Sequence, residues 1–244
     1  NWFEKLKSSY VDIFTVETKS YYEKLKKTSV FKNRIEYLPN GVSLLDIDLT
    51  ELDILPKENI VVTVGRLGTY EKNNSLLLKA IKNLPIELVK NWEFLLIGPS
   101  TQEFSKEVAL FKEKNPAIAN CINMTGEINN RNTLYSYLRR AKIICMTSLS
   151  ESTCISTLEG MYFGTYPVIT NYSDFTLDTT NNNKVGCIVE NKNINALVSS
   201  LKHIMSDDNL YCKGIESQSY VRSVFDYGVL TKSLDSILRR YIKG

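Results

Sequence analysis

Two cationic side chains, Arg66 and Lys72, flank the loop that follows the apolar segment Ile60–Val64. A guanidinium can hold a phosphate with its planar fork of donors, and an ammonium adds a mobile point charge. Gly65 would let a ligand approach the main chain closely. The loop therefore predicts a phosphate-binding site, with two solvated surface cations as the alternative interpretation.

A second candidate site begins after the apolar segment Lys142–Met146. Ser152 and Thr153 are residue types that cap helices, so the sequence predicts a helix over Ser152–Phe163. The free N–H groups of its first turn and the positive end of its dipole would attract an anion. We expect a diphosphate to bind there.

Glu151 and Glu159 bracket the start of this predicted helix. On a continuous helix their spacing corresponds to about 12 Å, whereas the two carboxyl groups of a glycosidase lie about 5–9.5 Å apart. An extended ligand suits the spacing better, such as a nucleotide sugar with hydroxyls at both ends and a diphosphate between them. The alternative, that both acids only complement a helix terminus and a solvent-exposed face, stays open.

The elements that must position these residues follow an alternating pattern of apolar runs and helical periods, which indicates an α/β fold with a parallel sheet. The predicted strands are Asp12–Val16, Arg34–Leu38, Ile60–Val64, Trp92–Ile97, Cys121–Met124, Lys142–Met146, Tyr166–Thr170 and Gly186–Val189. The predicted helices are Thr18–Lys27, Asn74–Asn83, Gln102–Asn115, Asn130–Arg140, Ser152–Phe163, Ile194–Asp207, Leu210–Phe225 and Val229–Ile242.

Leu38-Pro39-Asn40-Gly41-Val42 has the turn residues of a connector between domains. We expect residues 1–40 to be the remnant of an N-terminal domain with its linker, 41–228 a Rossmann-like, doubly wound domain, and 229–244 a C-terminal helix. Ligands of doubly wound sheets bind at the carboxyl ends of the strands. The loops that carry Arg66, Lys72 and Glu151 are thereby predicted to meet.

Composition narrows the class of protein. The 244 residues include 43% hydrophobic and 23% charged residues with a net charge of +3, which is too small for a nucleic-acid-binding surface. No apolar run approaches the roughly 18 residues of a membrane span, and the sequence starts at Asn without a signal segment, so we expect a soluble piece of a longer cytoplasmic protein. Five scattered cysteines without a C-x-x-C pair favour free thiols.

Three other signals carry less weight. Asp46-Ile47-Asp48 resembles a metal-binding Asp-x-Asp, but it lies in the connector and is interpreted as a solvated turn. His203 lies in an apolar-periodic helix and is predicted to be on the surface. Cys154 lacks a base that would make it a nucleophile. We therefore expect no metal site and no cofactor.

Six segments together resemble one known family in order and spacing. They are Val64-Gly65-Arg66-Leu67, Lys72-Asn73, Leu96-Ile97-Gly98, Gly126-Glu127-Ile128, the Glu151 and Glu159 pair, and Gly164-Thr165-Tyr166-Pro167-Val168. The family is glycosyltransferase family 4 (glycosyl transferases group 1), which has the two-domain GT-B fold. The similarity covers about residues 11–200, and residues 38–42 resemble the family's interdomain linker.

The resemblance implies metal-independent, retaining transfer of a sugar from a nucleotide diphosphate, with a UDP-sugar favoured over a GDP-sugar. Arg66 and Lys72 would neutralise the leaving diphosphate, Glu151 would contact the donor sugar, and Glu159 would hold the ribose. The remaining donor-binding residues implied are Gly65, Gly98, Gly126, Glu127, Ile128, Thr153, Cys154 and Ile155. Ser43, where the family often has Asp, and Cys154-Ile155 depart from the family pattern.

The partners implied are a nucleotide sugar and a glycan or lipid-linked acceptor, which would be bound by the missing N-terminal domain. Peripheral association of the full-length protein with the inner face of the membrane is an open alternative to a purely cytoplasmic location. A non-catalytic partner subunit of a transferase is the second hypothesis, and a nucleotide-sugar epimerase is a third. This part of the chain alone is expected to bind a nucleoside diphosphate but to transfer sugar slowly or not at all.

Overall fold

The structure, a computed structural model, describes residues 10–31, 34–43 and 56–242. The chain divides into two compact units, residues 1–43 with 222–244 and residues 44–221. The larger unit carries all of the predicted site residues. Each unit is described separately below.

The larger unit is built on a six-stranded sheet with the order β5-β4-β3-β6-β7-β8, in which every neighbouring pair is parallel. Its strands are β3 (Glu58–Val64), β4 (Glu93–Ile97), β5 (Ile122–Gly126), β6 (Ala141–Met146), β7 (Tyr166–Thr170) and β8 (Cys187–Val189). The strand order reverses between β3 and β6, as in a Rossmann sheet. The predicted doubly wound parallel fold is thereby confirmed.

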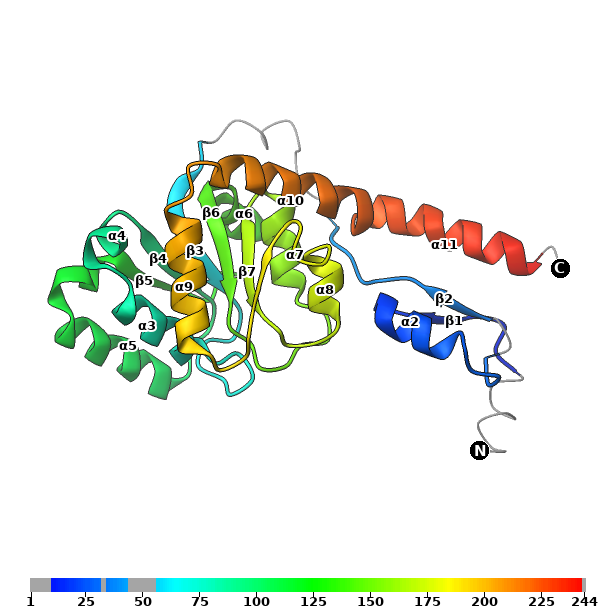
Figure 1. Cartoon of the computed structure of the whole chain (residues 1–244), viewed down its shortest axis with the longest axis horizontal. Coiled ribbons are helices and arrows are strands. Elements are labelled where there is room, and N and C mark those ends of the chain that lie inside the picture. Colours follow the sequence, from blue (N-terminus) through cyan, green and yellow to red (C-terminus); the bar gives the residue numbers. More distant parts are fainter. Residues whose placement is uncertain (1–9, 32–33, 44–55, 243–244) are drawn as a thin grey trace. The chain divides into compact units, whose positions relative to one another are not determined.

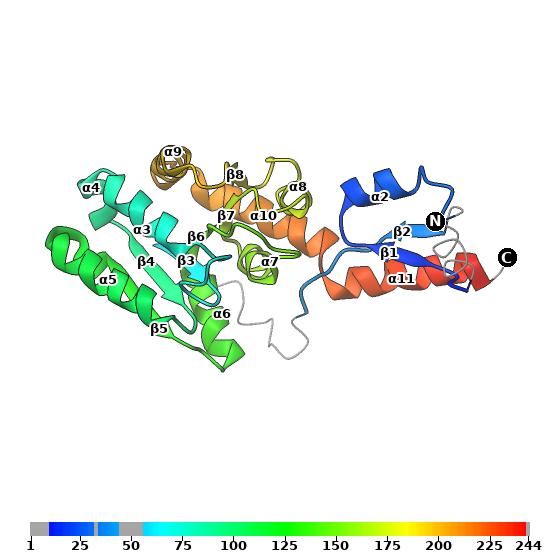
Figure 2. The ribbon, with the colours of Figure 1, turned by 90° about the horizontal axis from the view of Figure 1, so that it is seen from below.

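Helices cover both faces of this sheet. They are α3 (Asn74–Asn83), α4 (Ile86–Lys90), α5 (Gln102–Lys114), α6 (Arg131–Arg140), α7 (Ile155–Tyr162), α8 (Phe175–Thr179), α9 (Ile194–Met205) and α10 (Leu210–Val224), with the 3-10 helix η2 (Pro116–Cys121). Figure 1 shows their order along the chain, and Figure 2 shows α3 and α9 on one side of the sheet and α6 and α7 on the other. Because both faces are covered, the middle of each central strand is apolar and buried: Val62, Ile143 and Ile144 have no exposed surface.

The smaller unit contains β1 (Phe14–Val16), α2 (Lys19–Leu25), β2 (Ile35–Tyr37) and α11 (Tyr227–Ile242). β1 and β2 pair in parallel. Gly41 passes so close to the main chain that a Cβ atom would lie 2.3 Å from the carbonyl oxygen of Phe225, and Val42 forms a bridge with Asp226. The glycine of the predicted connector is therefore required by a close approach of two backbone segments.

Most predicted elements form within a few residues of their expected bounds, and α3 and β7 match them in full. The three short helical segments α4, η2 and α8 were not predicted. The largest error concerns α7, which begins at Ile155 rather than at Ser152. Ser152 and Thr153 precede the helix, the N-cap position is occupied by Cys154, and no side chain caps the first turn.

Two smaller expectations are confirmed. All five cysteines are free thiols. His203 is exposed in the last turn of α9. Among the described residues, no helix combines the length and apolar character that crossing a membrane would require.

Candidate functional site

Three of the predicted site residues, Arg66, Lys72 and Glu151, lie beyond the carboxyl ends of β3 and β6, where the strand order of the sheet reverses. In doubly wound sheets a crevice opens at this point because the connections on either side lead to opposite faces. The loop after β3 carries Arg66 and Lys72, and the loop after β6 carries Glu151. Two segments that are about eighty residues apart in the chain therefore meet, as predicted.

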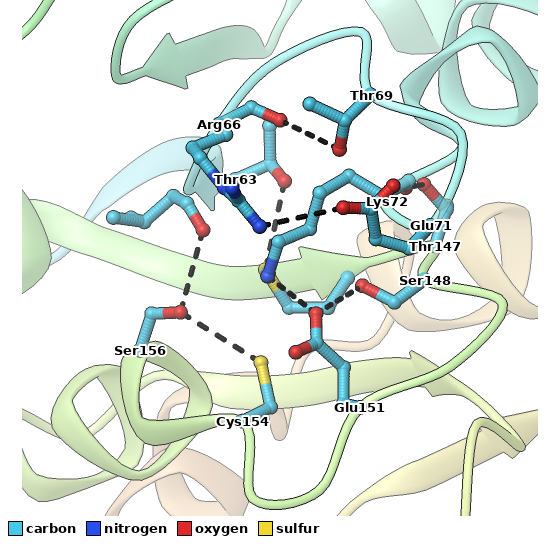
Figure 3. Close-up of polar contacts among 12 residues, drawn as sticks. Thr63, Arg66, Thr69, Glu71, Lys72, Thr147, Ser148, Glu151, Cys154 and Ser156 are labelled. Atoms are coloured by element: carbon cyan, nitrogen blue, oxygen red, sulfur yellow. Dashed lines mark hydrogen bonds and ion pairs between the residues drawn. The ribbon is translucent and has the colours of Figure 1, made fainter.

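Lys72 and Glu151 form an ion pair across these two loops. Figure 3 shows the Lys72 ammonium and the Glu151 carboxylate pointing toward each other. Their side chains are only 15% and 16% exposed, and Ser148 donates a second hydrogen bond to the same carboxylate oxygen at 2.8 Å. Because water has limited access, this pair interacts more strongly than one on an open surface.

The two loops are locked to each other by main-chain contacts. The hydroxyl of Thr147 donates to the carbonyl oxygens of Lys72 (3.2 Å) and Asn73 (3.0 Å), and the amide of Leu149 donates to the carbonyl of Glu71 at 2.7 Å. Asn73 adopts the left-handed conformation, with φ of 47°, which asparagine tolerates better than most residues. The Lys72 side chain is therefore positioned by the fold before any ligand binds.

Arg66 is held less tightly than Lys72. Its guanidinium lies 3.3 Å from Glu71, and its side chain is 69% exposed. A surface pair of this kind contributes at most about 1 kcal/mol and breaks easily. Arg66 is thus at the predicted place but is free to turn toward an incoming anion, whereas Lys72 is preplaced.

The start of α7 lies opposite these cations. The Ser156 hydroxyl donates to the carbonyl of Val64 at 3.3 Å, which joins the helix to the end of β3. The amide of Ile155 already donates to the carbonyl of Thr153 at 2.9 Å. The helix turn that was predicted to bind an anion therefore starts three residues later than expected, and the Ile155 amide is engaged in an internal turn.

Cys154 is buried at this helix start, with 2% of its surface exposed. Burial raises the pKa of its thiol, so the neutral form prevails near pH 7. This agrees with the sequence analysis, which gave Cys154 no nucleophilic role. Only its main chain remains as a group for a ligand.

Glu159, on α7, is also buried, and its partners were missed by the sequence analysis. The Tyr135 hydroxyl donates to its Oε1 at 3.2 Å, and Nη1 of Arg131 lies 3.5 Å from the same oxygen. Burial raises the pKa of the Glu159 carboxyl, and the two donors partly offset this effect. A cation and an aromatic residue four positions apart on a helix are too common a pattern to have predicted these contacts.

The three glycines of the predicted site have different reasons to be glycine. Gly65 has φ of 152°, and Gly98 has φ of 132° and packs so closely that a Cβ would lie 2.0 Å from the Gly65 carbonyl oxygen. Gly126 has φ of 72° and open space around it. Backbone packing therefore accounts for Gly98, while Gly126, with the exposed Glu127 after it, leaves room for a ligand.

Among the described residues, no three metal-ligating side chains gather at one point. Asp46 and Asp48 lie outside the described residues. The site therefore combines two cations and a helix start with two separate carboxylates, Glu151 and Glu159. Such an arrangement can bind a molecule that has negative charge at its centre and hydroxyl groups on both sides.

Comparison with known proteins also points to a sugar-transferring enzyme family. The family model for "Glycosyl transferases group 1" matches residues 47–218. A curated relative from Campylobacter jejuni, an alpha-1,4-N-acetyl-D-galactosaminyltransferase acting on an undecaprenol-diphosphate-linked glycan, is 28% identical over 191 residues, covering 78% of this chain. The chain spans about half of the length of that relative, 49%.

Solved structures share the fold. The sucrose-phosphate synthase from Thermosynechococcus elongatus matches with a TM-score of 0.75, 20% identity, and coverage of 99% of this chain and 61% of its own. S. aureus TarM, solved with UDP, gives 0.71 at 18% identity, covering 96% and 45%. Anabaena HepE, solved with UDP and glucose, gives 0.71 at 13% identity, covering 98% and 66%. These matches indicate the GT-B type of fold.

Proposed function

This chain belongs to the glycosyl transferases group 1 family, and we propose that it is the donor-binding part of a glycosyltransferase that uses a nucleotide-diphosphate sugar. The observation that carries the proposal is the preplaced Lys72–Glu151 pair at the point where the strand order reverses, opposite the start of α7. A cation beside a carboxylate fits the junction between the diphosphate and the sugar of such a donor.

In this proposal the main chemical task is to stabilise the negative charge that grows on the leaving diphosphate. Lys72 and Arg66 supply counter-charge, and the oriented peptide dipoles at the start of α7 add to it. With these cations we assign no metal ion to the reaction. Glu151 accepts hydrogen bonds from hydroxyls of the donor sugar, and Glu159 accepts them from the ribose.

Gly126, Glu127 and Ile128 are placed beside the base in this proposal. They end β5 and begin the loop before α6, which also carries the Arg131 and Tyr135 partners of Glu159. A UDP-sugar is the favoured donor, since TarM and HepE were each solved with UDP. We propose retention of configuration at the transferred sugar from family resemblance alone.

The acceptor is proposed to be a glycan or a lipid-linked glycan. The C. jejuni relative acts on an undecaprenol-linked glycan, and the match with this chain spans only 49% of that relative. We place acceptor binding outside this chain, in the remainder of a longer protein that would assemble surface polysaccharide or a glycoconjugate near the membrane. This chain alone should then bind the donor but transfer sugar slowly or not at all.

Calorimetric titration of the folded chain with UDP, GDP and ADP tests donor binding. Binding of at least one of these nucleotides, with uridine or the matching nucleoside much weaker, supports the proposal. Negligible heat with all of them, in protein that circular dichroism reports as folded, contradicts it.

The alternative is a non-catalytic subunit that keeps the nucleotide-sugar site and assists an active transferase. One structural neighbour is a complex, GtfA/B. Against this alternative, Lys72, Glu151 and Glu159 are all present and each engages a partner. A full-length protein that binds the nucleotide sugar but neither hydrolyses nor transfers it, except when a second protein is added, would favour the subunit.

A further inference from the structure

Helix α6 holds the carboxyl group of Glu159 from one side. The Tyr135 hydroxyl donates to Glu159 Oε1 at 3.2 Å, Arg131 Nη1 lies 3.5 Å from the same oxygen, and Arg131 also donates to the Tyr135 hydroxyl at 2.6 Å. The three groups therefore close a triangle on a single carboxylate oxygen. The other oxygen, Oε2, has no hydrogen bond with a residue in the described part of the chain.

The buried members of this triangle, Tyr135 and Glu159, are fixed by packing, whereas Arg131 is exposed to solvent. Tyr135 is 1% exposed, and its ring packs 4.9 Å from that of Phe163, at the end of α7. Glu159 is 8% exposed in its side chain, whereas that of Arg131 is 67% exposed. The Tyr135 ring also lies 5.8 Å from the Arg131 guanidinium, which stacks over it. Tyr135 is thus fixed by packing, and its hydrogen bond to Glu159 restricts the position of the Glu159 carboxylate.

The two donors also decide the charge of Glu159. Burial alone would favour a protonated carboxyl, because it raises the pKa of Glu159. Arg131 and Tyr135 act in the opposite direction, through charge and through the hydrogen bond, and they are the charged and titratable groups that the structure places against this carboxyl. A carboxylate with one oxygen anchored is a better acceptor for two hydroxyls than a mobile carboxylic acid, which carries a proton of its own.

We propose that Tyr135 and Arg131 are positioning residues that anchor Oε1 of Glu159 and present its free Oε2 to the vicinal hydroxyls of a nucleotide's ribose. The inference rests on the proposed donor site and adds to it the two residues that hold Glu159 in place for the ribose hydroxyls. Arg131 begins α6, directly after the loop placed beside the base, so it also borders the nucleoside part of the ligand.

The test compares Tyr135→Phe with Tyr137→Phe, a matched control on the same helix. Within the described part of the chain, the hydrogen bonds to Glu159 come from Arg131 and Tyr135 and not from Tyr137. UDP and 2′,3′-dideoxyuridine diphosphate are titrated into each protein. Loss of a hydrogen bond to a charged group should weaken UDP binding about tenfold in Tyr135→Phe. The same substitution should change binding of the dideoxy ligand less than about twofold, and the control should change neither.

A pH series adds a measurement that packing alone would not move. UDP affinity should fall as the pH drops through the pKa of Glu159, and this fall should occur at higher pH in Tyr135→Phe. The inference would be overturned if Tyr135→Phe lost equal affinity for both ligands, or if the Tyr137→Phe control lost as much affinity for UDP. Neither result would contradict the proposed nucleotide site.

A ligand-free measurement separates this inference from the proposed function. Carbon NMR titration of the Glu159 carboxyl should give a higher pKa in Tyr135→Phe than in the parent protein or the control. An unchanged pKa overturns the positioning role. If UDP fails to bind the parent protein while this pKa shift is present, the donor assignment is what fails, and the anchoring of Glu159 is supported.

Discussion

Replacing Lys72 with alanine isolates the diphosphate contact from the rest of the ligand. The Lys72 side chain is 15% exposed and directed at Glu151, beside the start of α7. Its ammonium is therefore already largely withdrawn from water when a ligand arrives, and binding needs little further desolvation. We expect Lys72→Ala to weaken binding of UDP strongly while leaving uridine nearly unaffected.

The magnitude follows from the type of contact. A hydrogen bond between charged groups contributes about 1.5–3 kcal/mol. A loss of about 2 kcal/mol corresponds to roughly 30-fold weaker binding of UDP. Glu151 keeps its hydrogen bond from Ser148, so the loop should persist and the substituted protein should still fold.

Isothermal titration calorimetry with UDP, uridine and pyrophosphate measures the three affinities. Lys79→Ala is the matched control, because Lys79 lies on α3, is exposed, and has no ion pair among the described residues. Equal losses for UDP and uridine in Lys72→Ala, or an equal loss of UDP binding in the Lys79→Ala control, would refute the assignment of Lys72 to the phosphates.

Three further predictions concern stability and reactivity. Burial lowers the pKa of Lys57 to about 7, whereas the side chain in the unfolded chain keeps a pKa of about 10.4. Between these two pH values the folded state therefore binds fewer protons than the unfolded state. The free energy of unfolding should rise from pH 7 to pH 9.5, by less than about 1.4 kcal/mol per pH unit. Urea denaturation at the two pH values should show this rise in the parent protein and not in Lys57→Met, and equal rises in both would contradict it. Gly98→Ala should destabilise the fold by about 3 kcal/mol or more in the same assay, since its Cβ would lie 2.0 Å from the Gly65 carbonyl oxygen. Gly126→Ala, at a position with open space around it, should destabilise it by about 1 kcal/mol. A larger loss of stability in Gly126→Ala than in Gly98→Ala would contradict the packing argument. Iodoacetamide should label exposed Cys212 long before the buried Cys145, whose pKa burial raises to about 12; mass spectrometry that finds Cys145 labelled first would refute this.

The sheet and most helices could be predicted because their signals are local. β7 is a run of β-branched and apolar residues that is buried along its whole length, and α3 has apolar residues at helical spacing on its buried face. The strand order itself was not predicted, since right-handed crossovers limit the possible orders of a parallel sheet without selecting one. The meeting of Lys72 with Glu151 is a consequence of that order.

The errors come from contacts between distant segments. Ser152 and Thr153 are good N-caps by type, but the preceding loop is held elsewhere: the Thr170 hydroxyl donates to the carbonyl of Ser148 at 2.5 Å, and Glu151 pairs with Lys72. Because of these contacts the helix begins at Ile155. They join segments that are far apart in the sequence, so no local pattern of residues indicates them.

The short helices and the partners of Glu159 were not predicted, for related reasons. α4 and α8 each have five residues, which is too few for helical periodicity to be recognised. Tyr135 meets Glu159 across two packed helices, at a separation of 24 residues. Packing of this kind is decided by the tertiary structure and is visible only in three dimensions.

The central claim is that a nucleoside diphosphate binds at the carboxyl ends of β3 and β6, and a crystal structure of the chain with UDP tests it most directly. The account predicts the diphosphate beside Lys72 and the start of α7, the ribose hydroxyls at Oε2 of Glu159, and the base beside Gly126. UDP bound on another face, or bound with its diphosphate away from Lys72, would contradict it.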